Sequence, residues 1–186
     1  MLEEKRAIKP GTLLFPNAVV LVSCSDGADK DNIITIGWPG GIGASPPRIG
    51  IPIKRQRYSH GLICKTREFV VNIPTSDQMH AINHCGTVSG RNHDKYLECK
   101  LDRVAPTKLR FAPSIGQCPI SLECRVEAIW DMGSHDYFVG RIVIAHVAEN
   151  WLGNDNRVQV RAEQLVALVS GNYYRLSEEQ GRSTYS

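Results

Sequence analysis

The stretch that decides the fold is residues 32–53, NIITIGWPGGIGASPPRIGIPI. Its two runs at 33–38 and 48–53 are rich in isoleucine, and β-branched residues favour strands. The glycine, serine and proline residues between the runs predict a turn-rich connection. The apolar run 18–22 precedes this stretch, and the turn at 26–31 is short. The sequence therefore predicts an antiparallel hairpin followed by a third strand.

Further along, the sequence predicts more strands and three short helices. The strands are expected at 69–73, 120–131, 137–149 and, less regularly, 159–169. The helices are expected at 58–66, roughly 78–85, and 94–99. Residues 103–119 contain three prolines and predict an irregular surface segment. Because no strand is followed by a helix long enough for a parallel crossover, the pattern predicts a mainly β barrel or sandwich, with one domain spanning 1–186.

Composition indicates a globular protein and argues against several classes of partner. The 186 residues are 42% hydrophobic and 22% charged, with a net charge of +3. Lysines and arginines are scattered, so nucleic-acid binding is not expected, whereas a small anionic ligand is compatible with the charge. No apolar run approaches the roughly 20 residues of a membrane span, so we expect a soluble, cytoplasmic protein. The polar end at 177–186 predicts disorder.

The six cysteines include no CxxC pair, and we expect them to be reduced. Cys24, Cys64 and Cys124 lie among apolar residues, which predicts small core side chains.

A possible anion site lies at the start of the first expected helix. Arg57 and Ser59 stand there, Lys54 precedes them, and Ser59 could cap the helix. A helix N-terminus offers free N–H groups, and an arginine with a hydroxyl beside it suits a phosphate. The simpler alternative is a capped helix with solvated basic residues. A second candidate is the glycine-containing loop at 85–95, for which a plain surface loop is the alternative.

Histidines supply two further candidates. His80 and His84 lie four residues apart on an expected helix, with Cys85 and His93 nearby, and such spacing can hold a metal ion. The HExxH pattern is missing, however, and polar helix positions are the simpler interpretation, so we assign no metal ligand. His135 lies in a predicted hairpin turn, where it could reach a ligand or remain solvated.

The ordered set of motifs resembles one family. The motifs are NIITIGW at 32–38, PP at 46–47, RYSH at 57–60, EFVVNIP at 68–74, CGTVSGRNHDK at 85–95, PISLEC at 119–124, GSH at 133–135, YFVG at 137–140 and YYRL at 173–176. Each motif alone is weak, but together they resemble the flavin reductase-like, FMN-binding split-barrel family, and most closely its flavoredoxin branch.

The resemblance implies a six-stranded antiparallel Greek-key split barrel with a few short helices, a homodimer, and FMN near the dimer interface. It implies that NADH or NADPH passes a hydride to the flavin N5, and the electron acceptor stays unknown. The implied cofactor-binding residues are Thr35, Ile36, Gly37 and Trp38 beside the flavin ring and ribityl chain, Arg57 and Ser59 at the phosphate with Lys54 and Tyr58 adjacent, and Cys85, Gly86, Ser89, Gly90 and Lys95 closing the phosphate end. His135 matches the family's turn histidine near the flavin and the nicotinamide, and is the implied catalytic residue.

Two other functions stay open. One is a non-enzymatic electron carrier with tightly bound FMN, and the other is a metal-binding module that uses His80, His84, Cys85 and His93. The glycine-rich segment 39–45 departs from the family pattern and could change access to the flavin.

Overall fold

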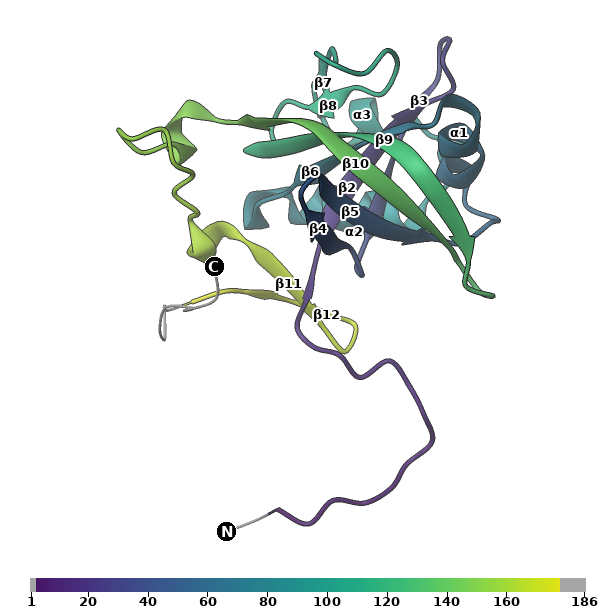
Figure 1. The fold of residues 1–186 in the computed structure, drawn as a ribbon, viewed down its shortest axis with the longest axis vertical. Coiled ribbons are helices and arrows are strands. Elements are labelled where there is room, and N and C mark those ends of the chain that lie inside the picture. The colour runs from purple at the N-terminus through teal and green to yellow at the C-terminus, as the bar shows by residue number, and fades with distance from the viewer. Residues whose placement is uncertain (1–2, 178–186) are drawn as a thin grey trace.

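The fold is a mainly β split barrel with short helices packed on it. The computed structural model describes residues 3–177. Its main sheet is antiparallel, with the strand order β3-β2-β6-β9-β10-β5-β4 (Figure 1). In chain order the strands are β2 (Val20–Ser25), β3 (Asp31–Ile36), β4 (Gly40–Ala44), β5 (Pro47–Ile53), β6 (Glu68–Ile73), β9 (Ile120–Asp131) and β10 (Asp136–Val147). The predicted hairpin is present as β2 and β3, which pair from Val20 with Ile36 to Ser25 with Asp31.

The main sheet has seven strands rather than the expected six, because the segment at 39–45 is not only a turn. Gly40–Ala44 forms the edge strand β4 and pairs with β5. This strand buries almost nothing, so its sequence carries no alternation of apolar and polar residues that could have revealed it. The predicted class of fold is nevertheless correct.

A smaller sheet joins the two ends of the described chain. It consists of β1 (Asn17–Ala18), β11 (Val166–Val169) and β12 (Asn172–Arg175). The strand expected over 159–169 was therefore predicted too long, because η3 (Ala162–Gln164) precedes β11 as a 3-10 helix. Before β1, residues 3–16 are exposed and form an arm whose N-terminal part extends away from the barrel (Figure 1).

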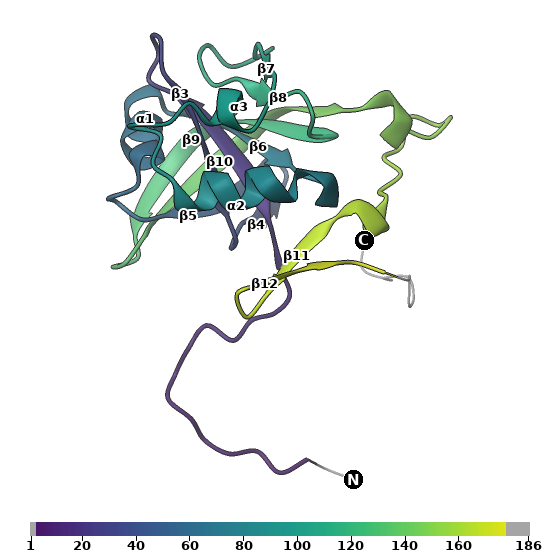
Figure 2. The ribbon, with the colours of Figure 1, turned by 180° about the vertical axis from the view of Figure 1, so that it is seen from behind.

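The segment between β6 and β9 carries three of the short helices. It contains η1 (Ser76–Gln78), α2 (Met79–Thr87), α3 (Lys95–Glu98) and a short ladder of β7 (Arg103–Val104) with β8 (Ser114–Ile115). Helix α2 lies across one face of the barrel (Figure 2), and η2 (Glu149–Trp151) follows β10. None of the helices within residues 3–177 is long and apolar enough to cross a membrane. The predicted disorder of residues 177–186 falls, apart from Ser177, outside the described residues.

Two hydrophobic clusters hold these layers together. One fills the barrel and includes Phe69 and Phe138, and the other lies under α2 and α3 and includes Tyr96. Gly140 on β10 is required here, since a Cβ atom would lie 2.4 Å from the Phe69 ring. Bulges in the β9–β10 pairing beside Gly140 bend these long strands, as closure of a barrel requires.

Helix α1 (Tyr58–Thr66) forms where predicted, but Ser59 does not cap it. The N-cap is Arg57, with extended backbone angles and no side-chain cap bond, and Ser59 is fully buried. All six cysteines are free. Burial of Cys24 and Cys124 is confirmed, whereas the prediction for Cys64 was wrong, because it lies on the exposed side of α1.

Candidate functional site

Two adjoining clefts lie between the end of β3, the end of β5 and the start of α1. The first has a volume of about 450 Å³ and the second about 280 Å³. Ile34, Lys54 and Arg57 line both, so the clefts form one elongated site. Strands β3 and β5 lie close together here although they are not hydrogen-bonded neighbours. The site therefore occupies the split of the barrel.

The first cleft is lined by aromatic and apolar side chains, and the residues predicted from the sequence at and just after the end of β3 are among them. Its lining includes Thr35, Ile36, Gly37, Trp38, Lys54, Arg57 and His135. Thr35 donates its hydroxyl hydrogen to the Ile82 carbonyl of α2, at 2.6 Å, so this hydroxyl positions β3 against α2. Gly37 allows close packing, because a Cβ atom there would lie 2.7 Å from Leu168 of β11.

The sequence did not reveal one wall of the first cleft. Thr12, Phe15 and Asn17 come from the N-terminal arm and β1, and Leu168, Ser170 and Gly171 come from the β11–β12 hairpin. No local pattern marks these residues, since the pairing of β1 with β11 brings these two distant segments together at the site.

His135 lies in the predicted hairpin turn between β9 and β10 and lines the first cleft. Its ring centroid is 5.9 Å from that of Trp38, with the planes tilted by 54°. The Ser134 hydroxyl lies 2.8 Å from His135 Nδ1. Partial burial, with a contribution from the positive charge of Lys54, holds the pKa of His135 below its usual value. The imidazole is therefore neutral at neutral pH and can exchange hydrogen bonds with a ligand.

A charged network fixes the turn that carries His135. Asp136 accepts two hydrogen bonds from Arg55, at 2.7 and 2.9 Å, and lies 2.8 Å from His60 Nε2. Arg55 also pairs with Asp131 at the other end of the turn. The hydrogen bonds from Arg55 and then His60 lower the pKa of Asp136 to about 2. Asp136 therefore stays ionised and anchors the turn at neutral pH.

The second cleft is strongly cationic. Lys54, Arg57, Arg91 and Lys95 line it, and no carboxylate does. Within residues 3–177, neither Lys54 nor Arg57 forms an ion pair. The guanidinium of Arg91 lies over the Tyr58 ring, 5.5 Å from its centroid. The first residues of α1 line the same cleft, and the N-terminus of a helix favours an anion.

Ser59 and Gly90 meet at Asn32, which sequence reasoning missed. Asn32 Nδ2 donates to the Ser59 hydroxyl at 2.7 Å, whereas Asn32 Oδ1 is buried and has no hydrogen-bond partner in the described part of the chain. A Cβ atom at Gly90 would lie 2.0 Å from that oxygen. Gly90 is thus needed for the loop to approach β3 closely. The signal available in the sequence was a polar residue at the start of a buried strand.

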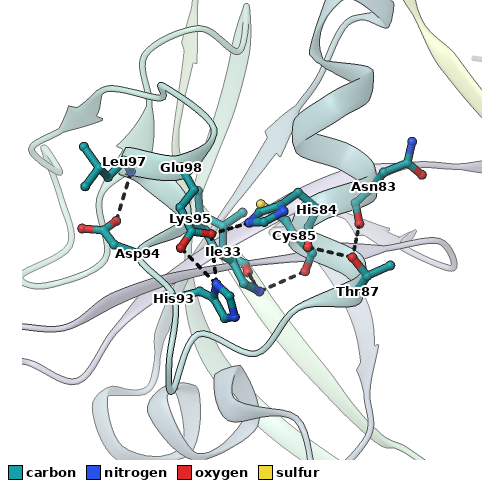
Figure 3. Close-up of polar contacts among 10 residues, drawn as sticks. All are labelled: Ile33, Asn83, His84, Cys85, Thr87, His93, Asp94, Lys95, Leu97 and Glu98. Carbon is teal, nitrogen blue, oxygen red and sulfur yellow. Dashed lines mark hydrogen bonds and ion pairs between the residues drawn. The ribbon is translucent and has the colours of Figure 1, made fainter.

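Lys95 is held by the protein itself. Its Nζ donates to the carbonyls of Ile33, at 2.6 Å, and Cys85, at 3.0 Å, and the side chain is almost fully buried (Figure 3). Burial lowers the pKa of Lys95. The ammonium ties the outer edge of β3 to the end of α2. It adds charge beside the cleft while its hydrogen bonds serve the fold.

The remaining residues of the predicted glycine-containing loop are placed differently from one another. Ser89 lines the second cleft. Cys85 lines it as well, but its thiol is buried, which raises its pKa to about 12. Gly86 lines neither cleft. Its close neighbour is Thr35, whose Cβ would lie 3.3 Å from an added Cβ, so Gly86 serves packing of α2 on β3.

His80 and His84 of α2 and His93 of the following loop line neither cleft. His84 and His93 approach Glu98 rather than Cys85, and His80 stacks on His84 with ring centroids 5.7 Å apart. Hydrogen bonds from His84 and His93 lower the pKa of Glu98. The set of four residues considered from the sequence is therefore not assembled as predicted.

The fold and site define a split-barrel protein with an elongated cleft, aromatic at one end and cationic at the other. The family comparison agrees. Residues 12–174 match the family described as "Flavin reductase like domain", and the chain belongs to this family. The resemblance seen in the sequence is thereby confirmed.

Curated relatives cover most of the domain. An uncharacterised protein of Archaeoglobus fulgidus is 35% identical over 130 residues, which span 70% of this chain and 72% of that protein. The NADH-dependent FMN reductase AsuE2 of Streptomyces nodosus subsp. asukaensis is 25% identical over 136 residues, spanning 73% of this chain and 71% of the reductase.

Solved structures share the whole fold. Flavoredoxin of Desulfovibrio vulgaris (Miyazaki F) superposes with a TM-score of 0.90 at 24% identity, covering 98% of this chain and 99% of the other. The FMN-binding protein of Thermus thermophilus superposes with a TM-score of 0.82 at 25% identity, covering 98% of this chain and 100% of the other.

Proposed function

We propose that this protein binds FMN across the two clefts and acts as an NAD(P)H-dependent flavin oxidoreductase. The observation that carries the proposal is the second cleft, with four cationic side chains, no carboxylate, and a direct connection to an aromatic cleft. FMN has the matching polarity, with a dianionic phosphate at one end and a planar ring at the other. The names of AsuE2 and of the Thermus thermophilus protein support the same ligand.

The residues of the second cleft fit the phosphate. Arg57 and Lys54 are exposed in the cleft and have no ion-pair partner among the residues that the structure describes, so a phosphate would supply a counter-charge. The first turn of α1 adds backbone N–H groups. The unpartnered Asn32 Oδ1 points to a ligand hydroxyl or an ordered water nearby, because buried acceptors are rarely left unsatisfied.

The first cleft would hold the flavin ring beside the end of β3 and Trp38. When bound, FMN would supply the redox chemistry by accepting a hydride from a reduced nicotinamide. The chain's own part is to bind, to orient and to exclude water. His135, neutral and held by the Arg55–Asp136 network, would orient the nicotinamide or a water through a hydrogen bond.

Electron carriage without enzymatic reduction is the second candidate, favoured by the close superposition on flavoredoxin. Anaerobic addition of NADH or NADPH to the FMN-loaded protein separates the two functions. Rapid bleaching of the visible flavin band supports the oxidoreductase. Bleaching that requires a partner reductase supports the carrier and contradicts our proposal.

We also propose that the protein is a homodimer in the cytoplasm. Leu13, Leu14 and Phe15 expose 63%, 79% and 40% of their surface on the N-terminal arm, and Phe15 lines the first cleft. A second copy packed on this arm would cover these side chains and complete the wall of the cleft. Light scattering should give about twice the 20.7 kDa chain mass. A mass of one chain would contradict the dimer.

The six free cysteines support the proposed cytoplasmic location, because free thiols suit a reducing compartment.

A further inference from the structure

A second cluster of ligating side chains lies beside the cationic cleft, on the outer side of α2 and α3. His84 belongs to α2, His93 to the loop that follows, and Glu98 to the last position of α3 (Figure 3). Glu98 Oε2 lies 2.5 Å from His84 Nε2, and Glu98 Oε1 lies 3.0 Å from His93 Nδ1. One ligating atom from each of the three side chains lies within 4.8 Å of the other two.

We propose that His84, His93 and Glu98 form a binding site for a divalent first-row transition-metal ion, with zinc as the representative ion. Two imidazoles and one carboxylate are a ligand set that zinc uses, with water completing the coordination. Ligand atoms around such an ion lie roughly 3.4 Å apart, given bonds of about 2.0–2.2 Å. The three side chains therefore need only small adjustments to surround an ion.

Access and chemistry are both suitable. The side chains of His84, His93 and Glu98 are 22%, 40% and 36% exposed, so an ion can enter from solvent and keep water ligands. Imidazole and carboxylate together favour zinc, nickel or copper over magnesium or calcium, which prefer oxygen ligands alone. His80 is not required, because its ring stacks on His84 and its nitrogens lie outside the group of ligating atoms.

Metal binding at this site should affect the loop between α2 and α3. Residues 88–94 connect α2 to α3, and this loop carries Ser89, Gly90 and Arg91 at the second cleft. An ion held by His84 at one end of the loop, His93 within it and Glu98 beyond it would join three segments of chain. We expect the bound ion to stabilise this loop, which lines the cationic cleft, whether or not a flavin is present.

Calorimetric titration of the chelator-treated full-length protein with ZnCl2 near neutral pH tests the site. Exposed Cys64 could bind zinc by itself, so the experiment uses the Cys64→Ser protein as the parent, and every variant is made in this background. The parent should bind one ion per chain. His84→Gln, His93→Gln and Glu98→Gln should each weaken zinc binding at least about tenfold. His146→Gln is the matched control, because His146 also pairs with a carboxylate, that of Glu123, elsewhere in the fold.

Two outcomes would overturn the site: no saturable one-to-one binding by the parent, or unchanged zinc affinity in both histidine variants. Equal melting temperatures of parent and variants in EDTA show that the variants are folded, and zinc should raise only those of the parent and the His146 control. Hydrogen exchange of residues 88–94 should slow with zinc in the parent. Unchanged exchange in zinc-loaded protein would refute the stabilisation of the loop.

Discussion

Replacing Lys95 by methionine should destabilise the fold more than it disturbs the ligand. The ammonium donates to two carbonyls, that of Ile33 on the outer edge of β3 and that of Cys85 near the end of α2. Neither has an obvious alternative partner, because edge strands and helix ends leave carbonyls unpaired. Each buried carbonyl left without a donor costs about 1–3 kcal/mol. Methionine fills the space and recovers part of this through burial, so we expect a loss of about 2–4 kcal/mol.

Urea unfolding monitored by circular dichroism measures this loss of unfolding free energy directly. In thermal unfolding, the melting temperature should fall by roughly 4–16 °C. Lys54→Met is the matched control, since Lys54 is exposed and lines both clefts. It should change the free energy of unfolding by less than about 0.5 kcal/mol while weakening FMN binding. The reasoning is refuted if Lys95→Met keeps wild-type stability and loses FMN, because Lys95 would then act as a phosphate ligand instead of a structural tie.

Two further changes follow from the same geometry. Gly90→Ala would push a Cβ atom against Asn32, which should cost about 1–3 kcal/mol of stability and weaken FMN binding. Gly61→Ala is the control, because a Cβ atom at Gly61 meets open space and should leave FMN affinity unchanged. Equal FMN affinities of the two variants would contradict the close approach of Gly90 to Asn32. Asp136 has its pKa lowered to about 2 in the folded state, below its unfolded value, so its stabilising contribution is complete above about pH 4 and is lost as the pH falls toward 2. Acid titration of unfolding should therefore show a smaller loss over that range in Asp136→Asn, and identical acid profiles would show that the pairing with Arg55 contributes nothing.

Local sequence was a good guide wherever burial imposes a pattern. Strands β2 and β3 are rich in valine and isoleucine, and both exist where they were expected, although their ends differ by two or three residues from the predicted runs 18–22 and 33–38. Helix α1 has the predicted bounds. Strand β4 escaped detection because glycines on an exposed edge need no apolar alternation. The length of the strand before residue 169 was overestimated for a related reason, since a 3-10 turn there is mostly exposed and shows no clear period.

Only the parts of the candidate site formed by residues close together in the sequence could be predicted. Arg57 and Ser59 stand together at a helix start, and the loop with Ser89 and Gly90 has a recognisable composition. The wall made by the N-terminal arm and the β11–β12 hairpin depends on pairing across about 150 residues, which no local pattern encodes. Asn32 was missed for the same reason, because its role arises from contacts with residues 27 and 58 positions later.

Comparison of FMN with riboflavin tests the central claim, that the cationic cleft holds the phosphate. The two ligands share ring and ribityl chain and differ only in the phosphate, so riboflavin serves as an internal control. Flavin fluorescence titration should show that the wild type prefers FMN, and that Arg57→Ala weakens FMN binding at least about tenfold, or 1.4 kcal/mol, while riboflavin binding is unchanged. Equal affinity of the wild type for both ligands, or FMN binding that is unaffected by Arg57→Ala, would contradict the account.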